Sequence, residues 1–202
     1  MNSSSVQSVA TGRNRSTAWR YGISFIVAFT VWFCLGDHFF HVRTGILTYH
    51  WKPMIDGQSV AIAAFFFALT VVGWLGYWWF AKFWDGEAPP SWGYVASTLV
   101  ALTVLYAASG QYGNSHPREF FWVVAGLWVL RVLVEGRGHP LATIAACLFV
   151  TCAVFAEAAV IFLGMWDYAR PDVLGIPAWL IPQYLHGAFL GVAVARKARA
   201  AR

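Results

Sequence analysis

Long uncharged hydrophobic runs, separated by short polar segments, dominate the sequence. The clearest run extends from residue 59 to residue 81 and reads SVAIAAFFFALTVVGWLGYWWFA, without a single charge. A helix needs about 20 consecutive apolar residues to cross the hydrocarbon core of a bilayer. This run therefore predicts a transmembrane helix, and five further runs resemble it.

The hydrophobic pattern predicts an all-α membrane protein, a bundle of six transmembrane helices. The predicted spans are residues 21–40, 59–81, 93–109, 120–134, 141–166 and 176–195. We expect three parts: a disordered basic N-terminal tail (1–20), a six-helix domain (21–196) and a basic C-terminal tail (197–202).

Charge supports this class and orients the chain. Only 11% of the residues are charged, against roughly 25% in soluble domains, so a separate soluble domain is excluded. With six spans, ten Lys and Arg residues fall on the side of both termini and four on the other side. By the positive-inside rule both termini are predicted to be cytoplasmic. The net charge of +5 then reflects basic membrane flanks near anionic lipids and not a nucleic-acid partner.

Glu157 is the sharpest candidate for chemistry because it lies in the middle of a predicted span. A carboxylate at that depth costs at least a few kcal/mol unless it is protonated, paired or exposed to a wet cavity. It is either a ligand or proton site, or an acid bonded to a neighbouring helix; Arg131 is a conceivable partner. Gln183 could line a cavity beside Pro182, which should bend or unwind the last helix because it lacks an N–H.

The GDHFFH segment at the end of the first span offers a second candidate. Asp37, His38 and His41 are either metal ligands or a polar helix end at the interface. Together with Glu157 they would be the groups of a lipid-modifying enzyme or a small transporter, which is the alternative function. The histidines are too scattered for a di-iron hydroxylase, and we predict no metal and no cofactor.

Two helix faces have open interpretations. Phe67, Trp74 and Trp78 share one face of the second span, which could line a lipid pocket, pack in the bundle or face lipid. Gly187 and Gly191 form a small-xxx-small row in the last span, which lets two helix backbones approach closely. This row could pack within the bundle or form a homo-oligomer.

Several dispersed motifs resemble those of the Insig (insulin-induced gene) family. They are WKPMIDG with Trp51, Pro53 and Gly57, the GLW at Gly126–Trp128, and the stretch containing Gly164, Tyr168, Pro171, Asp172, Trp179, Leu180, Gly187 and Arg196. The resemblance covers most of residues 21–196 and is strongest after residue 120. The chain is identified as similar to a bacterial, mycobacterial-type Insig homologue.

The resemblance implies a non-catalytic protein that binds a lipid in an intramembrane cavity. Animal members sense sterols; a bacterial plasma-membrane homologue is expected to hold a sterol or a diacylglycerol-like neutral lipid. The family's cavity glutamine falls at or next to Glu157, which strengthens that candidate. The acidic residue that the family needs for its escort protein is replaced by the run Val129–Val132, so an escort partner is not expected. The predicted ligand-binding residues are Glu157, Trp74, Trp78, Phe67, Trp128, Trp51 and Gln183.

Overall fold

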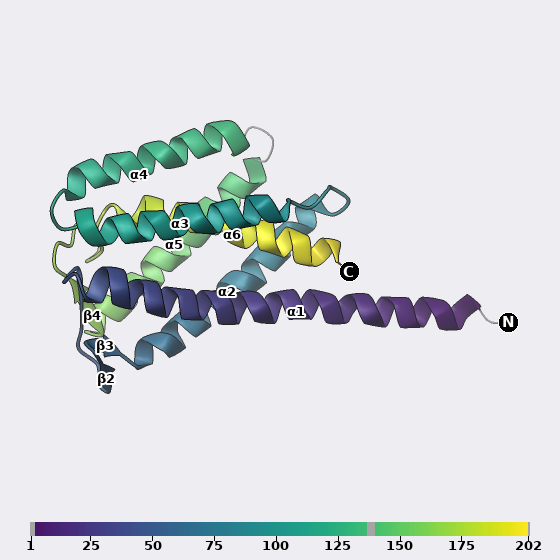
Figure 1. Ribbon diagram of the computed structural model, residues 1–202, viewed down its shortest axis with the longest axis horizontal. Helices are drawn as coiled ribbons and strands as arrows, with labels where there is room; N and C mark the ends of the chain where they lie inside the picture. The colour runs from purple at the N-terminus through teal and green to yellow at the C-terminus, as the bar shows by residue number, and fades with distance from the viewer. Residues whose placement is uncertain (1–2, 137–139, 202) are drawn as a thin grey trace.

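The computed structural model describes residues 3–136 and 140–201, which form six α-helices around one core (Figure 1). The helices are α1 (Ser3–Asp37), α2 (Ala61–Ala81), α3 (Trp92–Tyr112), α4 (Pro117–Arg131), α5 (Pro140–Phe162) and α6 (Leu180–Ala200). Short helical turns follow α1, α2 and α4: η1 (His38–Val42), η2 (Lys82–Trp84) and η3 (Val132–Gly136). Four short strands are β1 (Leu47–Tyr49), β2 (Met54–Ile55), β3 (Gln58–Ser59) and β4 (Trp166–Tyr168).

Helix α6 is the centre of the bundle and packs against all five other helices. Small residues make this possible: Ala195 and Ala198 are completely buried. A Cβ on Gly191 would collide with the ring of Tyr77 on α2, and one on Gly187 would lie 3.6 Å from Leu102 on α3. The small-residue row therefore packs within the bundle, and the alternative of an oligomer contact through these two glycines is wrong.

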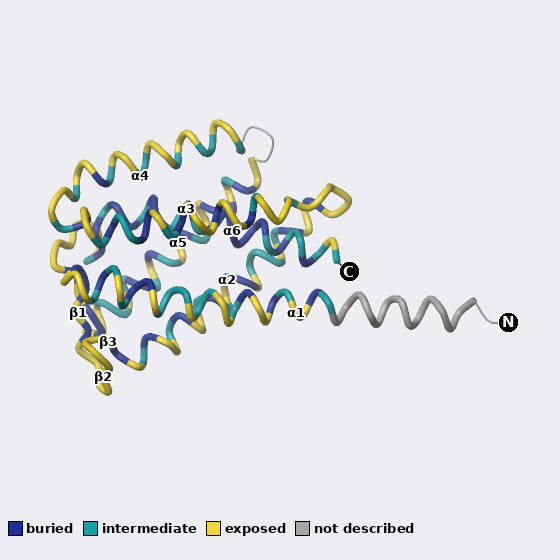
Figure 2. Tube along the Cα trace, viewed as in Figure 1, coloured by how far each residue is buried: buried dark blue, intermediate teal, exposed yellow. Residues whose placement is uncertain are grey.

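The outer faces of the bundle are apolar. Along α1, Ile23, Val27, Val31 and Leu35 are each more than half exposed at four-residue spacing. Figure 2 shows exposed residues along one side of α1 and α4, whereas α6 is largely buried. Such faces suit a hydrocarbon solvent, and the chain is an integral, multi-pass membrane protein.

Within the described part of the chain, four segments are long and apolar enough to cross a membrane. They are Thr17–Val42, Ala61–Trp84, Trp92–Tyr112 and Pro140–Phe162. Helix α4 is short, with 15 residues, and α6 carries polar and basic side chains among its apolar ones. The central position of α6 explains its composition, because it faces other helices rather than lipid. The count of six spans remains a prediction.

The strands gather at one end of the bundle. Strand β1 pairs antiparallel with β4, so that Leu47 faces Tyr168 and Tyr49 faces Trp166, and β2 pairs with β3. Successive helices alternate in direction, and both chain termini lie at the opposite end (Figure 1). The two termini thus share one end, and their cytoplasmic location stays a prediction.

Three local features differ from the sequence-based expectation. Residues 3–20 were expected to be disordered, but their backbone continues α1 as a helix, which costs little once the adjoining helix has nucleated. The fifth helix ends at Phe162 because Gly164 takes a left-handed conformation, with bonds from Gly164 N to Ile161 O and from Met165 N to Val160 O that cap the helix.

The third difference concerns Pro182. Helix α6 begins at Leu180, which makes Pro182 its third residue. The first four N–H groups of a helix have no partner within it, so the missing N–H costs nothing here. The predicted bend or unwinding at this proline is wrong.

The close packing of α6 predicts a stability effect. Gly191→Leu should drive a side chain into Tyr77 and destabilise the fold by about 1–3 kcal/mol, because overpacking forces neighbours from their rotamers. Thermal unfolding in detergent would measure it. Gly126→Leu on α4, where a Cβ meets nothing within 4 Å, is the control and should leave the midpoint unchanged. A change of oligomer size without loss of stability would contradict the interior position of Gly191.

Candidate functional site

A cavity of about 350 Å³ lies in the middle of the bundle. Its wall is formed by α1, α2, α3, α5 and α6, closed at one end by β1 and β4; α4 contributes nothing to it. The exposed residues of the wall are Ala68 and Val72 on α2 and Cys152 on α5. The mouth therefore lies between α2 and α5, along the helices, where the surroundings are lipid.

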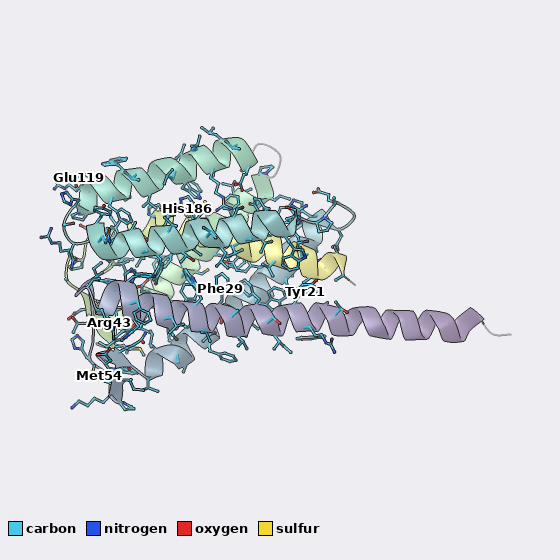
Figure 3. The ribbon with its side chains drawn as sticks, viewed as in Figure 1. Tyr21, Phe29, Arg43, Met54, Glu119 and His186 are labelled. Carbon is cyan, nitrogen blue, oxygen red and sulfur yellow. The ribbon has the colours of Figure 1, made fainter. Side chains whose placement is uncertain are left out.

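One face of α2 supplies much of the wall. Phe66, Leu69, Gly73 and Tyr77 line the cavity with helical spacing. The face predicted from the sequence, with Phe67, Trp74 and Trp78, is shifted by one residue along α2. One residue corresponds to a rotation of about 100° round the helix axis. Figure 3 shows Phe29 on α1, which also belongs to the wall.

The aromatic residues predicted to bind ligand lie outside the cavity. Phe67 is half-exposed on the outer face, and Trp74 is buried between α2 and α1, where its ring lies over Gly22. Trp78 packs against the guanidinium of Arg199. Trp51 is exposed in the loop before β2. Trp128 lies on α4. Of the seven predicted residues, Glu157 and Gln183 line the cavity.

Glu157 is held in the cavity wall by two tyrosines. It is 4% exposed, and its carboxylate accepts hydrogen bonds from the hydroxyl of Tyr168 and, at 2.6 Å, from that of Tyr184. Strand β4 and helix α6 thus satisfy the acid with neutral donors. Arg131, the conceivable partner, is bonded elsewhere.

Arg131 instead joins α4 to the bundle. Its guanidinium donates to Glu135 at 3.1 Å, to the hydroxyls of Tyr94 and Thr98 at 3.1 and 3.0 Å, and to the backbone oxygen of His186 at 3.3 Å. These contacts reach α3 and α6. The Arg131 guanidinium therefore fixes the position of the short α4 against the bundle.

Asp37 forms a second polar cluster at the same end of the cavity. It accepts from the hydroxyl of Tyr49, and its Oδ1 lies 3.1 Å from His41 Nδ1. His41 Nε2 lies 2.9 Å from Ser109 Oγ, whose own proton is donated to the backbone oxygen of Tyr106 at 2.7 Å. Asp37, His41 and Ser109 thus form one chain of polar contacts. In a hydrolytic triad the serine proton faces the histidine, whereas here the Ser109 hydroxyl is directed to the backbone oxygen of Tyr106.

Of the four residues of the enzyme alternative, Asp37 and Glu157 line the cavity and His41 contacts Asp37, whereas His38 lies outside the cavity wall. The Nε2 of His38 lies 3.3 Å from Asp56, which Arg43 also contacts at 2.8 Å (Figure 3 labels Arg43 at this end). Arg43 lowers the pKa of Asp56 below its ordinary value, with a smaller contribution from His38. Among the described residues, no three His, Cys, Asp or Glu side chains are grouped to hold a metal ion.

The tyrosines that hold the acids come from the two paired strands, which the sequence pattern did not predict. Burial raises the pKa of Tyr49 and of Tyr168 well above the ordinary value, and the neighbouring carboxylate adds to the effect in each case. Both hydroxyls therefore stay protonated and donate. Strands of three residues are too short for alternation to be recognised, so no sequence signal marked them.

Gln183 lies in the first turn of α6, is 1% exposed, and neither its amide oxygen nor its amide nitrogen has a hydrogen-bond partner in the protein. The wall also contains Trp166, whose buried Nε1 likewise has no partner. An unpaired buried polar group costs about 1–3 kcal/mol, so the partner of Gln183 is expected in the cavity. His186, one turn further, is instead directed to the backbone oxygen of Val124, at 3.3 Å.

Comparison with known proteins gives a structural match. No protein-family profile and no curated protein sequence matches the chain. Two solved structures of a mycobacterial Insig homologue, MvINS from Mycobacterium vanbaalenii, superpose with a TM-score of 0.74 each, at 17% and 18% identity. Each superposition covers 91% of this chain and 95% of the other, and one of the two is a cross-linked trimer. The chain therefore has the fold of a bacterial Insig homologue, as the resemblance in its sequence predicted.

Proposed function

We propose that this protein is a non-catalytic lipid-binding membrane protein, similar to a sterol sensor. It holds an uncharged lipid, such as a diacylglycerol or a sterol, in the central cavity. The observation that carries the proposal is Gln183: a buried amide that lines the cavity and has no partner in the protein. A buried polar group of this kind is satisfied when a ligand supplies the missing hydrogen bonds.

The wall matches an amphiphile with a hydroxyl headgroup. Gln183 offers both a donor and an acceptor, and the hydroxyl oxygens of tyrosines in the same wall, such as Tyr49 and Tyr168, can each accept a further bond. The rest of the wall is aromatic and aliphatic, with Phe33, Phe66 and Trp166 next to the polar end. At about 350 Å³ the cavity falls at the small end of the usual range for ligand pockets. Long acyl chains would therefore extend through the mouth between α2 and α5 into the bilayer.

The alternative of a lipid-modifying enzyme or small transporter has no observation in its favour. It requires Asp37, His38, His41 and Glu157 to act together, and His38 pairs with Asp56 outside the cavity. The hydroxyl of Ser109 donates to the backbone oxygen of Tyr106. Binding therefore accounts for the site better than catalysis.

The proposed assembly is a multi-pass protein of the bacterial plasma membrane, with six spans, both termini cytoplasmic and several copies per complex. The cross-linked trimer of MvINS supports a homo-oligomer. In this chain the contact would use the exposed apolar faces of the outer helices, since Gly187 and Gly191 are occupied within the bundle. No escort-protein partner is proposed.

Filling the cavity should abolish lipid binding. Ala153 on α5 lines the cavity, so we expect Ala153→Trp to exclude lipid from it. Native mass spectrometry of the purified protein, with lipid extracts analysed in parallel, would measure the loss of a bound neutral lipid. Ala159→Trp places the same side chain on the exposed face of α5 and should retain the lipid. Retention of the same lipid in both variants would contradict the proposed site.

Gln183→Leu should separate stability from binding. The leucine removes two unpaired buried polar atoms, so the delipidated variant should be at least as stable as the native protein in thermal unfolding. Binding of dioleoylglycerol should weaken by roughly tenfold, since a lost hydrogen bond of about 1.4 kcal/mol corresponds to that factor. Unchanged affinity of the variant for dioleoylglycerol would show that Gln183 does not contact the lipid. Lower thermal stability with unchanged affinity would show that Gln183 contributes only to packing.

A further inference from the structure

The ionisable side chains of the cavity wall are all acidic. Asp37 and Glu157 line the cavity, whereas no Lys, Arg or His belongs to the wall among the described residues. Both acids are buried and lie at the polar end, near the paired strands β1 and β4. The wall therefore offers no cation to an anionic headgroup.

The contacts of the two acids keep them as hydrogen-bond acceptors. Both oxygens of Glu157 accept from tyrosine hydroxyls. Asp37 accepts from Tyr49, and its Oδ1 lies 3.1 Å from Nδ1 of His41, which is outside the wall. Within the described part of the chain, Glu157 forms no ion pair, and the guanidinium of Arg131 is bonded to Glu135 and α3.

We propose that Asp37 and Glu157 form a charge filter that excludes lipids with phosphate or carboxylate headgroups from the cavity. The inference rests on the proposed lipid-binding function and adds its selectivity. A negative headgroup beside Gln183 would face two buried acids in a medium of low dielectric constant, where like charges repel strongly. Anionic phospholipids are therefore rejected, and an uncharged lipid with the same chains is accepted. The filter lets a scarce neutral lipid occupy the site in a membrane made mainly of phospholipid.

A series of lipids with identical acyl chains tests the filter. Delipidated full-length protein would be titrated with dioleoylglycerol (neutral), dioleoylphosphatidic acid (anionic) and dioleoyl-trimethylammonium-propane (cationic), with binding followed by native mass spectrometry. We expect the native protein to prefer the neutral over the anionic lipid on the order of 100-fold. The cationic lipid should bind more tightly than the anionic lipid. This order of affinities reports the sign of the cavity charge.

Isosteric variants identify the residues. Glu157→Gln and Asp37→Asn should each reduce the ratio of the affinity for the neutral lipid to that for the anionic lipid by roughly tenfold. Glu119→Gln, which removes an exposed acid at the start of α4, is the matched control and should leave the ratio unchanged (Figure 3). Gln183→Leu should weaken both lipids alike and also leave the ratio unchanged. If Asp37→Asn prevents folding, Glu157→Gln alone decides the outcome.

The outcomes test the charge filter separately from the proposed lipid binding. Equal affinity of the native protein for the neutral and the anionic lipid overturns the filter and leaves lipid binding intact. A ratio that neither acid variant changes also overturns it. A native protein that binds none of the three lipids overturns the proposed function, and the filter with it.

Discussion

The burial of α6 is the constraint on which the rest of the structure depends. Five helices pack around it, and small residues on α6 allow close contact, as at Gly191 under the ring of Tyr77. A helix in this position needs no continuous apolar surface, because its neighbours rather than lipid form its surroundings. It can therefore carry Gln183 and His186 in the interior of a membrane protein.

The position of α6 also creates the site. Its first turn lies at the end of the bundle where α1 and α5 finish and where β1 pairs with β4. Four elements consequently bring polar groups to one place: Asp37 from α1, Glu157 from α5, tyrosines from the strands, and Gln183 from α6. The remainder of the cavity is apolar, which gives the site a polar end and an apolar body, as an amphiphilic ligand requires.

The two acids and the glutamine differ in what the protein does for them. Each acid is satisfied by tyrosine hydroxyls, so the fold itself compensates for its burial. Gln183 is left without a hydrogen-bond partner, and its unpaired amide lowers the stability of the unliganded protein. This division fits a binding site in which the acids set the charge of the cavity while the amide contacts the ligand.

The sequence by itself determined the solvent, the helices and the most conspicuous polar residue. Uncharged runs of about 20 residues have few alternatives to crossing a membrane, and an acid such as Glu157 within one stands out because its burial is costly. The tertiary structure decided which faces meet. Phe66 rather than Phe67 lines the cavity, although both are equally apolar, because the rotation of α2 is set by its neighbours. The pairing of Tyr49 with Asp37 and of Tyr168 with Glu157 likewise depends on two short strands more than 100 residues apart, whose contact no local pattern encodes.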